Sequence, residues 1–155
     1  MAEIEHFFDP LDSDFDDFQP EMKNLVIPVW TENAQLSGQA LSAVPISDIT
    51  LGRVPRNSMK LYFLYFQRAV WGALNKGESA GDQILNYYLF KLFQFCESIG
   101  IDTSKLRFRE QLTDELAHYA TVCYDLECRT NIGWVECAGL ANRNGSNTLS
   151  RVCVG

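Results

Sequence analysis

The sequence lacks the features that mark several classes of protein. Its longest apolar run is far too short to span a membrane, and its first ten residues carry three acids and no basic start, so no signal peptide is predicted. The chain has 13 Lys and Arg residues against 20 Asp and Glu residues, which gives a formal net charge of −7. This charge argues against a surface that mostly binds nucleic acid, although a local contact stays open.

Cysteine is present but forms no recognisable pattern. The five cysteines make no Cys-x-x-Cys pair and leave one residue unmatched, so a zinc site and a disulfide framework are both poorly supported. We therefore expect reduced thiols, no bound metal and a cytoplasmic protein. With 155 residues, of which 46% are hydrophobic, the chain is long enough for one sizeable core and too short for two.

Four segments have the alternating or β-prone composition of strands. In the first of them Glu3, Glu5 and Phe7 share one face. Pro28 interrupts the second and predicts an edge strand, because proline cannot donate a hydrogen bond to a neighbouring strand. The four segments are residues 2–8, 24–30, 105–109 and 132–141.

Three segments have the spacing of helices. Residues 58–75 and 82–98 are apolar at three- and four-residue intervals, and the turn between Gly77 and Gly81 predicts that they form an antiparallel pair. Their aromatic stripes are typical of core packing. A third helix is predicted from an N-cap at Thr113 towards Tyr124, with acids in its first turn. Strands and helices together predict an α+β fold.

The strand at residues 133–143 is the most informative segment. Arg143 ends the strand. Gly139 precedes it, and a glycine inside a strand often marks a place where a ligand or another backbone approaches closely. A carboxylate such as Glu136 among apolar neighbours is costly without a partner or a ligand. A buried Glu–Arg pair, an edge-strand charge and a ligand site all fit this spacing. Strict alternation would place on one face Ile132, Trp134, Glu136, Ala138 and Leu140.

Three blocks of sequence point to one family when they are taken in order. They are Met-Ala-Glu-Ile-Glu-His-Phe at residues 1–7, Leu-Arg-Phe-Arg-Glu and Asp-Glu-Leu-Ala-His-Tyr-Ala within 106–120, and the strand at 133–143. Lesser matches lie at 34–39 and 124–127. The set resembles the catalytic-domain interior of a eukaryotic-type glycyl-tRNA synthetase, a class II aminoacyl-tRNA synthetase, up to about residue 143.

The resemblance implies a domain organisation. Residues 1–28 and 100–155 would form part of the antiparallel sheet of a class II catalytic domain, and residues 29–99 would be an insertion with the helical pair. The strands at 2–8 and 132–141 should then share one sheet. After Arg143 the family continues with a Tyr-Asp-Leu segment and a histidine, which are missing here. Residues 144–155 are therefore expected to diverge from the family.

Candidate substrate-binding residues also follow from the resemblance. Glu3 matches the family's acid that holds the ammonium group of glycine, and Arg143 matches the arginine placed to meet the substrate carboxylate. Glu115 and Glu136 fall on acids that are typical of the pocket. The chemistry agrees, because a small zwitterion needs a carboxylate at one end and a guanidinium at the other. No catalytic residue is assigned.

The implied activity is the ATP-dependent activation of glycine and its transfer to tRNA-Gly. ATP and magnesium would serve the full-length parent, which is expected to be a cytoplasmic homodimer without a membrane segment. The two family motifs that carry arginines for ATP have no counterpart in this sequence. We therefore expect this chain alone to bind no cofactor and to be inactive. The alternative is a non-catalytic binding or structural module derived from a synthetase.

Overall fold

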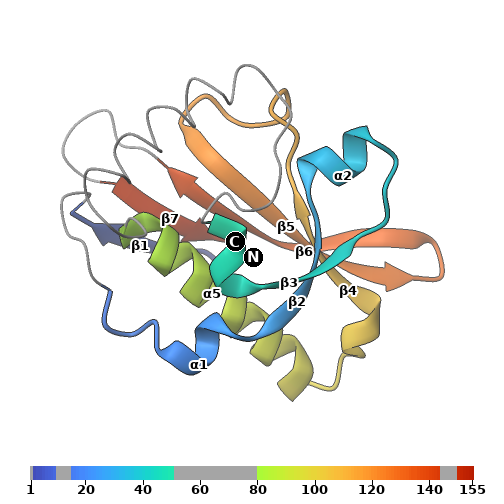
Figure 1. Ribbon diagram of the computed structural model, residues 1–155, viewed down its shortest axis with the longest axis horizontal. Coiled ribbons are helices and arrows are strands. Elements are labelled where there is room, and N and C mark those ends of the chain that lie inside the picture. The colour runs from blue at the N-terminus through green and yellow to red at the C-terminus, as the bar shows by residue number, and fades with distance from the viewer. Residues whose placement is uncertain (1, 10–14, 51–79, 144–149) are drawn as a thin grey trace.

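One open, mostly antiparallel sheet organises the molecule (Figure 1). The computed structural model describes residues 2–9, 15–50, 80–143 and 150–155. Within these ranges the strand order is β1-β7-β6-β5-β4-β2-β3, and only β2 and β4 pair in parallel. The strands are β1 (Ile4–Phe8), β2 (Val26–Trp30), β3 (Ser42–Pro45), β4 (Leu106–Glu110), β5 (Ala120–Thr130), β6 (Gly133–Arg143) and β7 (Ser150–Val154). The predicted α+β fold is thereby confirmed.

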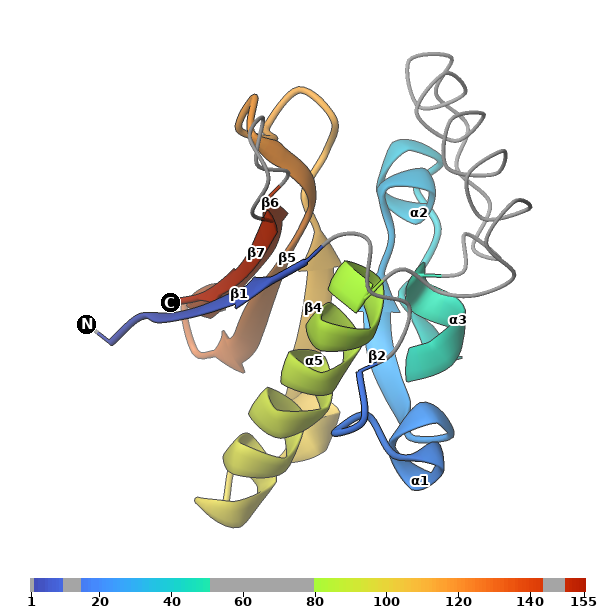
Figure 2. The same ribbon diagram turned by 90° about the vertical axis from the view of Figure 1, so that its left-hand side faces the viewer.

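A long helix, α5 (Ala80–Ser98), lies across one face of this sheet (Figure 2). Its Ile84, Leu85 and Leu89 are fully buried, because they follow the three- and four-residue spacing that the sequence shows. They join a core that includes Leu126 and Leu140 of the sheet. This helix confirms the prediction for residues 82–98. The predicted helix at 58–75, and with it the helical pair, lies outside the described residues.

Shorter helices complete the fold. α1 (Pro20–Lys23) and α3 (Ile46–Thr50) pack beside α5, while α2 (Glu32–Leu36) and the 3-10 turn η1 (Thr103–Lys105) lie along the chain next to strand ends. The two chain termini lie side by side at the β1–β7 edge, as Figure 2 shows. No helix among the described residues is long and apolar enough to cross a membrane.

The predicted helix after Thr113 is wrong. Residues 111–119 form turns, and strand β5 begins at Ala120. Val122, Tyr124 and Leu126 are buried, and their alternation fills the core from a strand. The acids that follow Thr113 resembled a helical first turn, but pairing with β4 and β6 gives this segment more buried area than a short exposed helix would.

The predicted edge position of β2 is also wrong, because β3 pairs along its outer side. Pro28 lies opposite Ala43 in that ladder, and parallel pairing with β4 covers only Val29 and Trp30. The missing N–H of Pro28 therefore leaves no gap in the β2–β4 pairing. A four-residue strand in the mixed segment after residue 32 was enough to cover the edge.

A bulge in β6 overturns the predicted face alternation. Leu126 pairs with Ala138, and the next residue Glu127 pairs with Glu136, so Cys137 is the extra residue. Ala138 and Leu140 therefore face the helix, whereas Trp134 and Glu136 face the other side of the sheet. Gly139, Ala141 and Arg143 share that second face with Glu136.

The predicted placement of residues 2–8 and 132–141 in one sheet is confirmed, with an addition that the sequence did not suggest. Strand β7, from the segment expected to diverge, lies between β1 and β6. Its Val152 is fully buried in the core. The predicted division into catalytic domain and insertion stays a prediction, although strands from both parts belong to this sheet.

Candidate functional site

The face of the sheet opposite α5 brings the predicted site residues onto one surface, here called the open face. Strand register arranges its side chains in rows across the sheet. One row contains Arg109, Asp125 and Gly139, and Gly139 exchanges two backbone hydrogen bonds with Gly155. The next row is Cys123, Ala141, Cys153 and Glu5, and the third is Arg143, Arg151 and Phe7.

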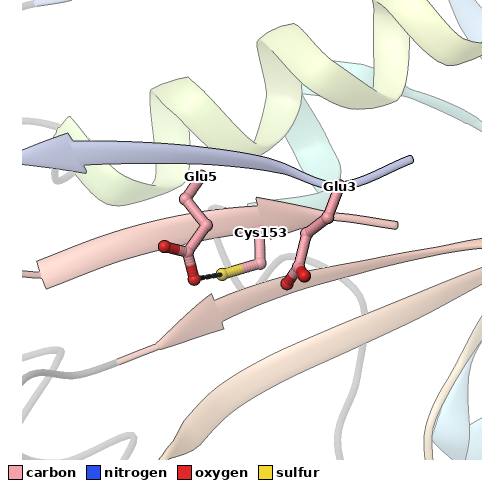
Figure 3. Close-up of side chains that lie close together, drawn as sticks. All are labelled: Glu3, Glu5 and Cys153. Carbon is pink, nitrogen blue, oxygen red and sulfur yellow. Dashed lines mark hydrogen bonds between the residues drawn. The ribbon is translucent and has the colours of Figure 1, made fainter. Parts of the chain in front are cut away.

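Glu3 and Glu5 extend from β1 and its approach towards Cys153 of β7 (Figure 3). The ligand-type atoms of the three side chains all lie within 4.8 Å of one another, and the Cys153 thiol is 3.7 Å from Oε1 of Glu5. Arg151 balances part of this charge, because its Nε lies 3.6 Å from the same oxygen. Glu3 itself is exposed and has room to accept a ligand.

These three residues offer two carboxylates and one thiol to a cation. Burial raises the pKa of Cys153, and the neighbouring Glu5 carboxylate raises it further, while Arg143 and Arg151 oppose the shift. The protonated thiol donates to Glu5, so the two carboxylates carry the negative charge of the group. They suit a cation, either a metal ion or a hydrogen-bond donor such as an ammonium group.

Arg143 lies at the other end of the open face. Its guanidinium stacks on the ring of Tyr119 at 4.9 Å, and its Nε is buried with no hydrogen-bond partner in the described part of the chain. The positive charge of Arg143 acts on both Cys123 and Cys153, whose pKa values it lowers against the effect of burial. The charge of Arg143 therefore lies within electrostatic reach of the middle row, and its buried Nε is a donor without a partner among the described residues.

Glu3 and Arg143 do not touch. Glu3 lies beside Gly155, in the row of Gly139, and Arg143 follows four residues further along β6, two strands away. The two backbones are therefore offset by about 13 Å along the strands and about 10 Å across them. The row of Cys153 lies between their rows, Glu3 is within 4.8 Å of the thiol, and the charge of Arg143 acts on its pKa. A ligand that contacts both charges has to bridge this separation.

Glu115 is held in place by a structural role. Its carboxylate binds the Arg109 guanidinium at 2.7, 3.1 and 3.2 Å and accepts a hydrogen bond from the Leu112 amide. Arg109 also lies 3.6 Å from Glu127 and 3.9 Å from Asp125. Glu115 therefore closes an ion-pair network at the margin of the open face and has little capacity left for a substrate.

A second arginine fixes the neighbouring part of the network. The Arg107 guanidinium lies between two indole rings, 4.3 Å from Trp30 and 4.1 Å from Trp134, and its Nε donates to Glu127. Stacking and ion pairing together restrict the rotamers of all four side chains. This part of the open face is therefore rigid.

The turn segment that carries Glu115 is anchored by a buried acid. Glu32 of α2 accepts hydrogen bonds from both the amide and the hydroxyl of Thr113, at 2.8 and 2.6 Å. The Glu32 amide in turn donates to Glu110. Thr113 therefore serves as a donor to another element and does not cap a helix.

Glu136 is an exposed acid on the open face. Within the described residues it has no hydrogen bond or ion pair, and the bulge at Cys137 aims it over Gly139. Burial raises the pKa of Glu136, and the charges of Asp125 and Glu127 raise it further. A positive ligand group would relieve this repulsion, so Glu136 is placed to assist Glu3.

Asp125 gives the open face a predicted pH dependence. Its side chain is buried, and burial raises its pKa above the ordinary value of 3.8 even though Gln111 donates a hydrogen bond at 2.8 Å. The fold favours the protonated form, so its contribution to stability is present below pH 3.8 and is lost as pH rises through the folded-state pKa. We expect Asp125→Asn to remove this loss, measured by urea unfolding at a series of pH values.

The matched control for this experiment has the opposite sign. Hydrogen bonds from Ser104 lower the pKa of the exposed Asp102, so its contribution is present at neutral pH and lost on acidification. Asp102→Asn should therefore lose stability relative to the parent chain as pH rises, while Asp125→Asn gains it. Parallel pH profiles for Asp125→Asn and the parent chain would contradict the assignment.

Several residues of the open face were not predicted from the sequence. Asp125 was placed after the predicted third helix and Arg109 in a plain strand, and neither they nor Glu5 and Cys153 received a role. The alternation Arg151-Val152-Cys153-Val154 was an available signal for β7, but four residues after a glycine- and asparagine-rich stretch are a weak pattern. The site residues Glu3, Glu136 and Arg143 do share one face, and Glu115 lies at its margin.

Comparison with known proteins identifies relatives of this chain. No family model matches it. It is 35% identical over 144 residues to "Glycine--tRNA ligase 1, mitochondrial" of Saccharomyces cerevisiae, which is 93% of this chain and 17% of that protein. It is 37% identical to "Glycine--tRNA ligase 2" of the same yeast, over 92% of this chain and 19% of that protein.

A third relative, the glycine--tRNA ligase of Methanocaldococcus jannaschii, is 32% identical over 92% of this chain and 21% of its own length. The chain therefore spans about a fifth of the length of the curated relatives that it matches. The predicted resemblance is confirmed, and over nearly its whole length this chain is homologous to a segment of the glycine–tRNA ligases.

Proposed function

We propose that this chain is a segment of a glycine–tRNA ligase and carries part of its glycine-binding site. The observation that supports this most is the similarity over 93% of the chain to proteins of that name, together with one open face that holds Glu3, Glu136 and Arg143. The alternative of a non-catalytic module is not favoured by these relatives. The parent protein would use glycine and tRNA-Gly as substrates, as a cytoplasmic homodimer.

The residues of the open face have distinct roles in this proposal. Glu3 and Glu136, at opposite ends of the Gly155–Gly139 pair, accept hydrogen bonds from the ammonium group of glycine. Arg143, which is partly exposed, donates to the glycine carboxylate from the outer nitrogens of its guanidinium. Glycine has few other groups that a protein can recognise, so the charged residues at its two ends fix its orientation. This positioning is what the segment contributes to the reaction.

The acidic part of the open face is a poor site for ATP. The carboxylates of Glu115, Asp125, Glu127 and Glu136 outnumber the two arginines beside them, and Arg107 and Arg109 are already engaged by Glu127 and Glu115. A triphosphate would be repelled there. ATP would supply the adenylyl group that activates the carboxylate, with pyrophosphate as the leaving group, and we place the binding of ATP and magnesium outside these residues. The 155-residue chain by itself is expected to show no ATP–pyrophosphate exchange.

The proposal is tested by transplanting the segment. The 143 residues of yeast glycine--tRNA ligase 2 that match this chain are replaced by the chain itself, and glycine-dependent ATP–pyrophosphate exchange is measured. We expect exchange in the chimera and none with the 155-residue chain alone. A folded chimera that exchanges no pyrophosphate with glycine would overturn the proposal, and exchange by the chain alone would overturn the placement of ATP binding.

A further inference from the structure

The open face has a bare strip of backbone between two acidic groups. Gly139 and Gly155 lie opposite each other, joined by backbone hydrogen bonds of 2.6 and 3.0 Å. Asp125 is the neighbour of Gly139 on one side, and on the other side the Cγ of Glu3 lies 3.8 Å from where a Cβ of Gly155 would be. Two glycines in register leave peptide groups accessible to a ligand in a way that no other residue type allows.

The space above Gly139 is bounded but open. A Cβ built on Gly139 would have the Glu136 Oε1 at 3.7 Å and the Gly155 carbonyl oxygen at 4.0 Å as its nearest neighbours among the described residues. Both are ordinary contact distances, so the fold has room for a methyl group at this position. Folding does not require glycine there, and another reason for glycine must be sought.

The bulge at Cys137 gives this space its chemical character. Because of it, Glu136 faces the same side as Gly139 and its carboxylate lies over that residue. Glu3 lies at the other end of the glycine pair, and its carboxylate approaches Cys153. A ligand resting on the two glycines would have carboxylates on both sides and Arg143 along the strand. An apolar side chain placed there would strip water from charged groups.

We propose that Gly139 limits the size of the amino acid that this site accepts. The inference rests on the proposed function and adds a specificity-determining residue to it. The main chain of glycine lies against the backbone of Gly139 and Gly155, with its ammonium group between Glu3 and Glu136. A methyl group on Gly139 would occupy the volume that the bound glycine needs. A methyl group on the ligand would have to displace one of the two carboxylates that bound this volume.

The test is a binding titration with the 155-residue chain, labelled with nitrogen-15 and followed through its amide resonances. We expect glycine to bind about tenfold or more tightly than L-alanine, since one methyl group in a fitted site is worth about that factor. Gly139→Ala should weaken glycine binding about tenfold or more, with amide shifts away from the strip unchanged. Val135→Ala, on the helix side of β6 opposite Cys128, should bind glycine as the parent chain does.

The outcomes separate the inference from the proposed function. Equal glycine affinity of Gly139→Ala and the parent chain overturns the inference and leaves the proposed function standing. A parent chain that shows no glycine binding overturns the glycine site itself. If Gly139→Ala loses its native spectrum, Gly155→Ala is the second variant to test. Its added methyl group lies 3.8 Å from Glu3 and so enters the same strip from the other glycine. Unchanged glycine affinity in that variant would also overturn the inference.

Discussion

Arg143→Ala is expected to weaken glycine binding to this chain by about 10- to 150-fold, because a hydrogen bond to a charged group contributes about 1.5–3 kcal/mol. Arg143 is partly exposed, and its guanidinium has a ring contact with Tyr119 but no ion pair among the described residues, so its outer nitrogens can donate to a carboxylate. The Tyr119 ring holds its plane and limits the entropy lost on binding. The nitrogen-15 titration with glycine provides the dissociation constant.

Two further variants make this prediction specific. Arg143→Lys keeps the charge but loses the planar pair of donors, and should fall between the parent chain and Arg143→Ala. Arg129→Ala removes the same charge from an exposed position near the tip of the β5–β6 hairpin, and should leave glycine affinity unchanged. An equal loss of glycine affinity in Arg129→Ala and Arg143→Ala would mean that Arg143 acts only through the net charge of the chain. That result would contradict a direct contact between Arg143 and glycine.

The sequence predicted those elements of the fold whose patterns are long or unambiguous. Helix α5 has many apolar positions at regular intervals, and β4 and β6 alternate clearly. The segment after Thr113 had competing signals, because an acidic first turn favoured a helix while Val122, Tyr124 and Leu126 alternated as a strand. Tertiary pairing on both sides of β5 decided for the strand, and this is information that a local pattern does not contain.

The candidate site was predicted in its residues and not in its geometry. Glu3, Glu136 and Arg143 came from a resemblance, and strict alternation would have put Glu136 on the opposite face from Arg143. One inserted residue, Cys137, reverses that relation, and a bulge of this kind has no reliable signature in a single sequence. Likewise, β7 had to be seen in place before Cys153 could be connected with Glu3 and Glu5.

Phe108→Ala is expected to be the most destabilising single substitution that we predict, with a loss of about 3–5 kcal/mol in the free energy of unfolding. Phe108 is 0% exposed on β4, where it pairs with Leu126 of β5 and Val29 of β2. Removing its ring opens a cavity between the sheet and the helices. Since small domains have about 5–15 kcal/mol in total, a large share of the stability depends on this side chain.

The measurement is urea unfolding followed by circular dichroism, with the change read from the midpoint at constant slope. Phe95→Ala is the matched control, because this phenylalanine of α5 is 57% exposed and its loss should stay within about 0.5 kcal/mol. Phe108→Leu keeps most of the volume and should cost about 1.5 kcal/mol or less, so a graded effect is measurable even where Phe108→Ala does not fold. Similar midpoints for Phe108→Leu, Phe95→Ala and Phe108→Ala would contradict a core centred on β4.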